Sequence, residues 1–252
     1  MDKRGEAGAG ELLTVIVPAY NEEPMLAAAL AALERELVAS GQPYEIVLVD
    51  DASRDRTGRI ADELAATSAT LRVFHHEVNG GIGAGIRTGV AQARGEFLIV
   101  SPVDSPLTAA QVRAYVAAAA DCDIVVGRRA RRVGYTWWMR LGAGVYPAML
   151  RALFGVPLHD FNWIHLYRRA VFERVTVEFG GIVFLAEILI KAHDAGFRLR
   201  EIPAEMQART AGRPTVSRPR VIWRTFRNVL LLWWKLRGPG ARRRGAPSVA
   251  SR

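Results

Sequence analysis

The feature that most constrains the fold is an apolar run that stops at two carboxylates. Residues 46–49 (Ile-Val-Leu-Val) carry no polar side chain, and Asp50 and Asp51 follow directly. Such a continuous apolar run is typical of a parallel strand that is covered on both faces. A second run, at 13–18, ends in the polar segment 20–22. Because open α/β sheets bind ligands at the carboxyl ends of their strands, these two endings predict a nucleotide pocket.

Strand and helix patterns alternate along the first half of the chain. Expected strands lie at 13–18, 45–50, 71–75, 96–101 and 123–127, with helices between them at 24–40, 57–67, 83–93 and 108–120. This spacing predicts an α/β fold with a mostly parallel sheet and helices on both faces. Asn21 is placed to cap the first helix. The pattern changes after residue 127, where an aromatic and apolar stretch (135–156) precedes a strand at 164–167, a helix at 183–195 and a strand at 198–203.

Basic residues concentrate toward the C-terminus. From Ala204 onward there are twelve basic residues and one acidic residue, so this segment carries +11 and the rest of the chain carries −2. Within it, residues 221–236 place basic and polar groups on one side of a helix and Trp, Phe, Leu and Val on the other, which is typical of a membrane-interface helix. A helix packed on the domain's own core or on a second subunit is the alternative. The partner we expect is an anionic membrane surface and not nucleic acid, because the cations alternate with Leu and Trp.

The expected organisation has four parts. A disordered N-terminus (1–11) precedes a folded domain (12–215), an amphipathic membrane-interface helix (216–237) and a basic disordered tail (238–252). The single cysteine excludes an internal disulfide framework and fits a reducing compartment. The sequence has neither an apolar signal region nor an apolar run long enough to span a bilayer. We therefore expect a cytoplasmic protein that is peripherally associated with the inner face of the membrane.

Several motifs resemble those of family 2 glycosyltransferases. They are 15–22 (Val-Ile-Val-Pro-Ala-Tyr-Asn-Glu), 49–57 (Val-Asp-Asp-Ala-Ser-Arg-Asp-Arg-Thr), the turn 79–85 and Gly127-Arg128-Arg129. Within that family the chain is similar to dolichyl- and polyprenyl-phosphate mannosyltransferases, on the evidence of Asp160, 166–169, Glu187, 202–203 and 209–213. Each motif is weak alone, but their order and spacing across residues 12–215 are specific.

The resemblance implies a GT-A fold, which is the fold of nucleotide-diphospho-sugar transferases. It implies inverting transfer of a sugar, with GDP-mannose or UDP-glucose as the expected donor and a polyprenyl phosphate as the acceptor. Two alternatives stay open. One is transfer to a hydroxyl of a saccharide or small molecule, and the other is a catalytically impaired homologue that only binds a nucleotide-sugar. The oligomeric state is not indicated.

The resemblance also assigns the nucleotide site residue by residue. The base and ribose would be held by Pro18, Tyr20, Glu22 and Asp51. The Gly-rich turn, with Gly81 and Gly83, would let backbone N–H groups approach a phosphate. This turn is not a dinucleotide fingerprint, because Ile86 stands where the third glycine of that motif is required.

The metal motif implied by the resemblance is incomplete. The family places two aspartates, one residue apart, after the fourth strand, but here Pro102 takes the first position and Asp104 the second. One carboxylate together with diphosphate oxygens can still hold Mg²⁺ or Mn²⁺, so Asp104 is the expected metal ligand. Compensation of the diphosphate charge by arginines, or loss of activity, stays open. The arginines concerned are Arg128, Arg129, Arg131 and Arg132.

Asp104, Asp160 and Glu187 are the expected catalytic carboxylates. Asp160 is either an acceptor-side residue or part of a structural turn. Glu187 lies in an apolar helix, where an unpaired carboxylate is costly, so pairing with an arginine is its alternative. A phosphate acceptor is already ionised near neutral pH and needs no strong base, whereas a hydroxyl acceptor would need Asp160 or Glu187 as base.

Three arginines are expected to contact the donor diphosphate or the lipid phosphate. Arg209 and Arg213 frame a Gly-containing loop and are predicted to act with Arg129 as a phosphate clamp. Simple attraction to a membrane surface is the alternative for the loop pair. The segment 162–165 is one residue shorter than in the mannosyltransferases, which leaves room for an acceptor other than dolichyl phosphate.

Overall fold

The computed structural model describes residues 10–129, 137–204 and 219–238, with side chains from Gly144 in the second range and from Arg220 in the third. Its centre is a seven-stranded sheet in the order β3-β2-β1-β4-β6-β5-β7. The strands are β1 (Leu13–Ala19), β2 (Tyr44–Asp50), β3 (Leu71–His75), β4 (Phe97–Val100), β5 (Ile124–Arg129), β6 (His165–Arg168) and β7 (Leu199–Ala204). The helices are α1 (Leu26–Ser40), α2 (Thr57–Ala65), α3 (Ile82–Gln92), α4 (Ala109–Ala118), α5 (Trp137–Phe154), α6 (Ala170–Arg174), α7 (Val183–Asp194) and α8 (Pro219–Arg237).

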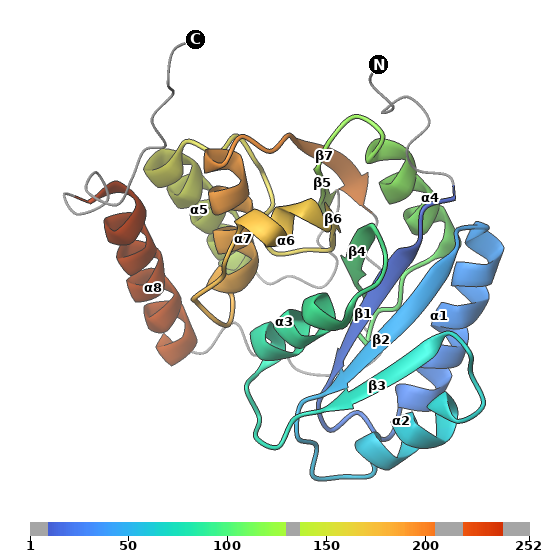
Figure 1. Ribbon diagram of the computed structural model, residues 1–252. Helices are drawn as coiled ribbons and strands as arrows, with labels where there is room; N and C mark the ends of the chain where they lie inside the picture. The colour runs from blue at the N-terminus through green and yellow to red at the C-terminus, as the bar shows by residue number, and fades with distance from the viewer. Residues whose placement is uncertain (1–9, 130–136, 205–218, 239–252) are drawn as a thin grey trace.

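The sheet is mostly parallel, which confirms the sequence-based prediction. β2 pairs with β1 and β3 in parallel, β1 pairs with β4 in parallel, and β5 pairs with β7 in parallel. β6 runs antiparallel to both of its neighbours, β4 and β5. Helices cover both faces of the sheet (Figure 1).

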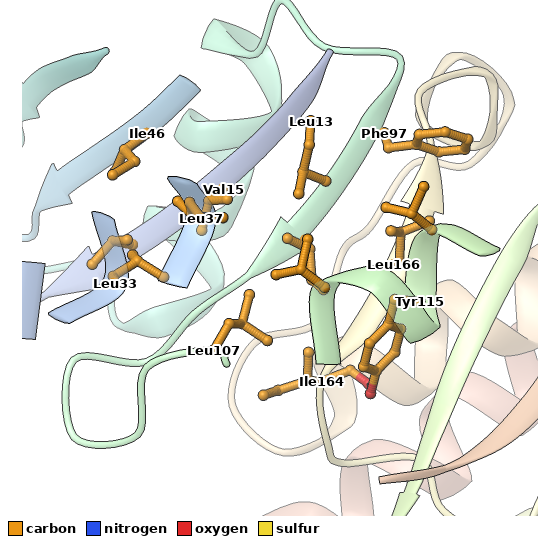
Figure 2. Packing of buried hydrophobic residues seen from close by; sticks show 14 of the residues in the cluster. Leu13, Val15, Leu33, Leu37, Ile46, Phe97, Leu107, Tyr115, Ile164 and Leu166 are labelled. Atoms are coloured by element: carbon orange, nitrogen blue, oxygen red, sulfur yellow. The ribbon is translucent and has the colours of Figure 1, made fainter. Parts of the chain in front are cut away.

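Two large hydrophobic clusters and one small one occupy the faces of the sheet, and residues along the strands alternate between faces. Val125 belongs to the cluster with α1 and α4, whereas Ile124 and Val126 belong to the cluster with α5 and α7. This alternation is the two-residue period of a strand, and it explains why the core strands carry uninterrupted apolar runs. Figure 2 shows part of the first cluster, where Leu33 and Leu37 of α1 lie near β1.

Three local expectations differ from the structure. The helix expected at 24–40 begins at Leu26, and Asn21 does not cap it, because the Asn21 side-chain oxygen accepts from the backbone N–H of Arg54 instead. The sequence pattern predicts no helix or strand in the stretch 135–156, yet this stretch contains the 18-residue helix α5. Pro147 lies inside that helix, where a proline removes a backbone donor and obscures the helical pattern. The short helix α6 was also missed.

The C-terminal amphipathic helix expected from the sequence forms as α8. It packs beside α5 and α7 at one edge of the molecule (Figure 1). Among the helices that the structure describes, none combines the length and apolar character that crossing a bilayer requires. The ends expected to be disordered lie outside the described residues, apart from 10–11 and Gly238.

Candidate active site

The polar loops meet at the carboxyl edge of the parallel strands. Ala19 at the end of β1 is level with Asp50 at the end of β2, which is level with His75 at the end of β3. The strand order reverses between β1 and β4, because β2 and β3 lie on one side of β1 and β4 lies on the other. In open α/β sheets such a reversal opens a crevice at the carboxyl ends, where ligands bind. The loops that follow β1 and β4 therefore flank the expected site.

Asp51 is buried at this edge and anchors the Gly-rich turn. Its Oδ1 accepts from the backbone N–H of Gly80 at 2.9 Å, and its Oδ2 accepts from that of Gly81 at 2.7 Å. His76 Nδ1 lies 2.7 Å from the same Oδ1, and His76 Nε2 lies 2.8 Å from the hydroxyl of Thr88 in α3. The carboxylate therefore sits near the N-terminus of α3, where the helix dipole favours a negative charge.

The glycines of this turn have structural roles as well as their predicted nucleotide role. Gly81 has a φ of 75°, in the left-handed region that favours glycine, and its N–H is already bonded to Asp51. A Cβ on Gly83 would lie 3.0 Å from the ring of Phe184 in α7. The turn is thus held by Asp51 on one side and packed against α7 on the other.

The loop after β1 is tied to the loop after β2. Asn21, with a φ of 54°, donates its backbone N–H to the hydroxyl of Ser53, and Glu22 donates its N–H to the hydroxyl of Thr57 at 2.8 Å. Pro18 packs behind the loop, because a Cβ on Gly85 would lie 3.1 Å from its Cβ. Tyr20 is exposed beside these bonds. The loop that carries the predicted base-binding residues is therefore held in place by hydrogen bonds to the loop after β2.

Glu22, in the loop after β1, and Asp104, in the loop after β4, lie near enough for their charges to interact. Burial raises the pKa of Glu22, and the negative charges of Asp104 and Asp55 raise it further. Asp104 follows Pro102 in the loop after β4, where the Ser101 hydroxyl accepts from the backbone N–H of Leu107 at 3.2 Å. Among the described residues, no group of three or more His, Cys, Asp or Glu side chains is arranged to hold a metal. Two neighbouring carboxylates still fit a hard cation that arrives on a diphosphate.

Arg129 and Asp160 form a buried two-pronged ion pair at the end of β5. The guanidinium donates through Nε to Asp160 Oδ2 and through Nη2 to Asp160 Oδ1, each at 2.7 Å. Burial acts to raise the pKa of Asp160, but the hydrogen bonds and charge of Arg129 outweigh it, so the pKa is lowered. Arg129 also stacks over the ring of Trp163, 5.2 Å from its centroid. Two of the predicted site residues are therefore partners of each other.

Glu187 is fully buried in α7, and its partners lie close by in the chain. It accepts from the backbone N–H groups of Glu178 and Phe179, and the ammonium of Lys191 lies 2.7 Å from its Oε1. The expected pairing partner was an arginine, but the cation is a lysine one helical turn away. The carboxylate thus fixes the segment before α7.

Sequence patterns did not predict the role of Glu201, and they indicated His165 only as part of the segment that departs from the mannosyltransferases. Glu201 in β7 accepts from the backbone N–H groups of His159 and Asp160, which holds the turn that carries Asp160. His165 is buried, and burial lowers its pKa to about 4. Its Nδ1 has no hydrogen-bond partner in the part of the chain that the structure describes. The sequence signal in this region was His165 itself. Glu201 gave no signal, because its partners His159 and Asp160 are 42 and 41 positions away. The predicted clamp residues Arg209 and Arg213 lie outside the described residues, as do Arg131 and Arg132.

Comparisons with known proteins show the family to which the chain belongs. The sequence model of glycosyl transferase family 2 matches residues 14–176. An uncharacterized glycosyltransferase of Mycobacterium tuberculosis is 31% identical over 212 residues, which is 83% of this chain and 91% of that protein. The undecaprenyl-phosphate 4-deoxy-4-formamido-L-arabinose transferase of Pseudomonas aeruginosa is 34% identical over 167 residues, which is 65% of this chain and 49% of that protein.

Solved structures show the same fold. The chain superimposes on glucosyl-3-phosphoglycerate synthase from Mycobacterium tuberculosis, crystallised with Mn²⁺, UDP and glucosyl-3-phosphoglycerate, with a TM-score of 0.66 and 20% identity over 90% of this chain and 80% of that one. A crystal of the same synthase with Mg²⁺ and UDP gives a TM-score of 0.68 and 19% identity over 88% of this chain and 79% of that one.

A mixed sheet whose strand order reverses between β1 and β4, with acidic residues in the loops that follow both strands, defines a GT-A fold, the fold of nucleotide-diphospho-sugar transferases. The chain belongs to glycosyltransferase family 2 and is a glycosyltransferase.

Proposed function

We propose that this glycosyltransferase moves a hexose, either mannose or glucose, from a GDP or UDP donor to a polyprenyl phosphate, with inversion at the anomeric carbon. The relative from Pseudomonas aeruginosa acts on undecaprenyl phosphate, which supports a lipid phosphate acceptor. Because that acceptor resides in a membrane, the proposal includes peripheral association with the inner face of the membrane.

The observation that carries the proposal is that both candidate general bases are paired with cations. Asp160 is bonded to Arg129, and its pKa is lowered, which makes it a weaker base. Glu187 is enclosed by two backbone donors and Lys191. A hydroxyl acceptor needs a base to remove its proton, whereas an ionised phosphate does not. Because both carboxylates are paired with cations, the site favours an acceptor that is already ionised and needs no base.

On the donor side, the exposed ring of Tyr20 would offer a stacking surface for the base, and Glu22, in the same loop after β1, would accept from ribose hydroxyls. Asp51 acts mainly by fixing the turn that begins α3. Its Oδ2 accepts from the backbone N–H of Gly81, and a carboxylate oxygen can accept a further hydrogen bond, here from a base N–H group. Glycine at Gly81 and Gly83 lets this turn lie close to both Asp51 and α7.

A divalent cation is part of the proposal. Asp104, with help from Glu22, would hold Mg²⁺ or Mn²⁺ together with the diphosphate oxygens, because Pro102 supplies no ligand. When bound, such an ion neutralises charge on the diphosphate leaving group. The known metal complexes of glucosyl-3-phosphoglycerate synthase support divalent metal use within this fold.

In the reaction, a phosphate oxygen of the lipid forms a bond to the anomeric carbon while the bond from that carbon to the diphosphate breaks. The nucleoside diphosphate leaves with the electron pair, and no proton transfer is required at the acceptor. The contribution of the chain is to position both substrates and to stabilise the developing charge. Arg129, which contacts Asp160 and Trp163, would hold the acceptor phosphate in this proposal, together with the predicted clamp residues Arg209 and Arg213.

The test uses the full-length chain with radiolabelled nucleotide-sugars and a purified polyprenyl phosphate. We expect label in the organic phase from one hexose donor, with an anomeric configuration opposite to that of the donor. Asp104→Asn should lower transfer on the order of a hundredfold, which corresponds to the several kcal/mol that a metal contributes. Glu63→Gln, at an exposed position in α2, is the matched control and should leave transfer unchanged.

Other outcomes would point elsewhere. Label on a saccharide and none on lipid would overturn the acceptor assignment. Tight nucleotide binding without turnover of any donor would favour the impaired homologue. An Asp104→Asn variant with full activity and full metal dependence would refute the metal assignment while leaving the acceptor open.

A further inference from the structure

Helix α8 presents three different faces, and one of them packs against the other described residues of the molecule. Val229 and Leu232 are buried in the hydrophobic cluster shared with α5 and α7, and Leu236 packs against that cluster. Two ion pairs reinforce the attachment, one between Lys235 and Glu178 and the other between Arg237 and Asp194. The helix is therefore clamped to the domain along one side.

The second face of α8 is apolar and exposed. Helical spacing of 100° per residue places six large side chains on one continuous strip, which are Ile222, Trp223, Phe226, Leu230, Trp233 and Trp234. They are between 37% and 68% exposed. The rings of Trp223 and Phe226 stack with their centroids 6.4 Å apart. Single exposed apolar residues are ordinary, but a strip of this kind marks an interaction surface.

The third face is mainly basic, with the exposed Leu231 among its arginines, and lies directly beside the apolar strip. Arg220, Arg224 and Arg227 are exposed, and none of them takes part in an ion pair within the described ranges of the chain. Helix α8 contains no acidic residue at all. The outer surface of the helix therefore combines an apolar strip with a row of arginines that lack protein counter-charges there.

We propose that this outer surface of α8 docks on an anionic lipid bilayer, with the helix lying in the plane of the interface. The apolar strip would enter the boundary between headgroups and acyl chains, and the arginine row would contact anionic headgroups. Three tryptophans fit this level of a membrane, because their rings are apolar and their N–H groups are polar. Charge complementarity selects this occupant. A symmetric contact between two copies of α8 would instead bring arginine rows together with no carboxylate from either helix.

The clamp gives the docking a consequence for the reaction. Because Val229, Leu232 and the two ion pairs fix α8 on the catalytic domain, a docked helix would set the orientation of the whole domain relative to the lipid surface. The outer surface of α8 would then hold the catalytic domain in one fixed orientation on the membrane. This inference rests on the proposed function for its role in catalysis, but binding to lipid can be measured without any donor or acceptor.

The experiment measures co-flotation of the full chain with vesicles of phosphatidylcholine alone or mixed with phosphatidylglycerol. We expect binding to the mixed vesicles and little to the neutral ones. Arg220→Gln, Arg224→Gln and Arg227→Gln together should weaken binding to mixed vesicles about a hundredfold, since each basic residue contributes about fivefold near such a surface. The matched control substitutes three exposed arginines on α1, α2 and α4, across the molecule from α8 (Figure 1). These are Arg35, Arg59 and Arg113, and their replacement by Gln should have much less effect.

A second variant tests the apolar strip. Trp223→Ser, Phe226→Ser and Trp234→Ser change exposed positions, so the fold should survive, and they should abolish binding to mixed vesicles. Val38→Ser and Val78→Ser, also exposed, serve as controls. Unchanged flotation of both α8 variants would overturn the inference. So would a dimer in solution that the strip variant dissociates while the wild-type chain ignores vesicles.

The two proposals fail separately. If vesicle binding is as expected but no lipid is glycosylated, the docking surface stands and the acceptor assignment falls. If the α8 variants still glycosylate a detergent-solubilised polyprenyl phosphate but lose activity on vesicle-borne acceptor, both proposals are supported. If neither variant affects activity on vesicle-borne acceptor, the proposal that docking of α8 orients the catalytic domain is overturned.

Discussion

Replacing Glu187 by glutamine separates a structural carboxylate from a catalytic base. The side chain is fully buried, and its two oxygens accept from the backbone N–H groups of Glu178 and Phe179 and face the ammonium of Lys191. Glutamine keeps the shape of the side chain but removes its charge. Its NH₂ group is a donor, and it would face the N–H and ammonium donors from which the carboxylate accepts. We therefore expect Glu187→Gln to destabilise the fold and to leave the chemical step intact.

The magnitude follows from what Lys191 retains. Breaking a buried ion pair by removing one partner costs about 3–5 kcal/mol. Lys191 keeps the carbonyl of Thr176 at 2.8 Å and the carboxylate of Glu178 at 3.3 Å, so we take the lower end, about 3 kcal/mol. For a domain of this size each kcal/mol lowers the melting temperature by about 2–4 °C, which gives a decrease of about 6–12 °C.

The assay pairs thermal unfolding with sugar transfer measured well below the melting temperature of the variant. Glu178→Gln is the matched control, because Glu178 is half exposed and contacts the same lysine, so its loss should cost less than about 1 kcal/mol. A general base contributes about 10²–10⁴-fold to the rate. A Glu187→Gln variant that melts normally but loses activity on that scale would refute the structural role and restore Glu187 as a base.

Two further predictions concern stability. His165 has a pKa of about 4 in the folded chain against 6.5 when unfolded, so only the unfolded state takes up a proton as the pH falls through this window. Stability should therefore fall by up to about 3 kcal/mol between pH 6.5 and pH 4, and His165→Gln should remove that part of the slope in denaturant titrations at several pH values. Gly127→Ala would place a Cβ 1.9 Å from the Tyr115 hydroxyl and 2.7 Å from the Ile164 carbonyl, so it should cost about 1–3 kcal/mol. Adding Tyr115→Phe should recover part of that loss in stability. If the free-energy changes of the two single variants simply add in the double variant, the clash with the Tyr115 hydroxyl is contradicted.

The fold was predictable because its signals are local. The run at 46–49 and the carboxylates that follow it fix both a buried strand and the edge at which it ends, and the same holds for β1. Helix α5 escaped prediction because Pro147 and the adjoining glycines interrupt the pattern that identifies a helix. Its identity depends on burial of Leu150 and Phe154 against α7, which only the folded chain provides.

For the predicted site residues, the sequence carried a signal for only some of the pairings that the structure shows. Lys191 stands four residues after Glu187, so the sequence did contain a signal for that ion pair. Arg129 and Asp160 are separated by 31 positions, and no local pattern joins them. Asp51 shows the same limit, because its partners at Gly80 and Gly81 become neighbours only when β2 and α3 pack together.

The electrostatics of the crevice separate the two possible acceptor classes. A base for a hydroxyl acceptor should have a pKa moved toward neutrality, and the Arg129 pair moves that of Asp160 in the opposite direction. Glu22 is moved upward, by burial and by Asp104, but it lies in the loop after β1 among the residues expected to hold the nucleoside. A cation that joins Asp104 on the diphosphate would also reverse part of that upward shift. These directions of pKa shift support the proposal that the acid groups hold the donor and that the acceptor is already ionised.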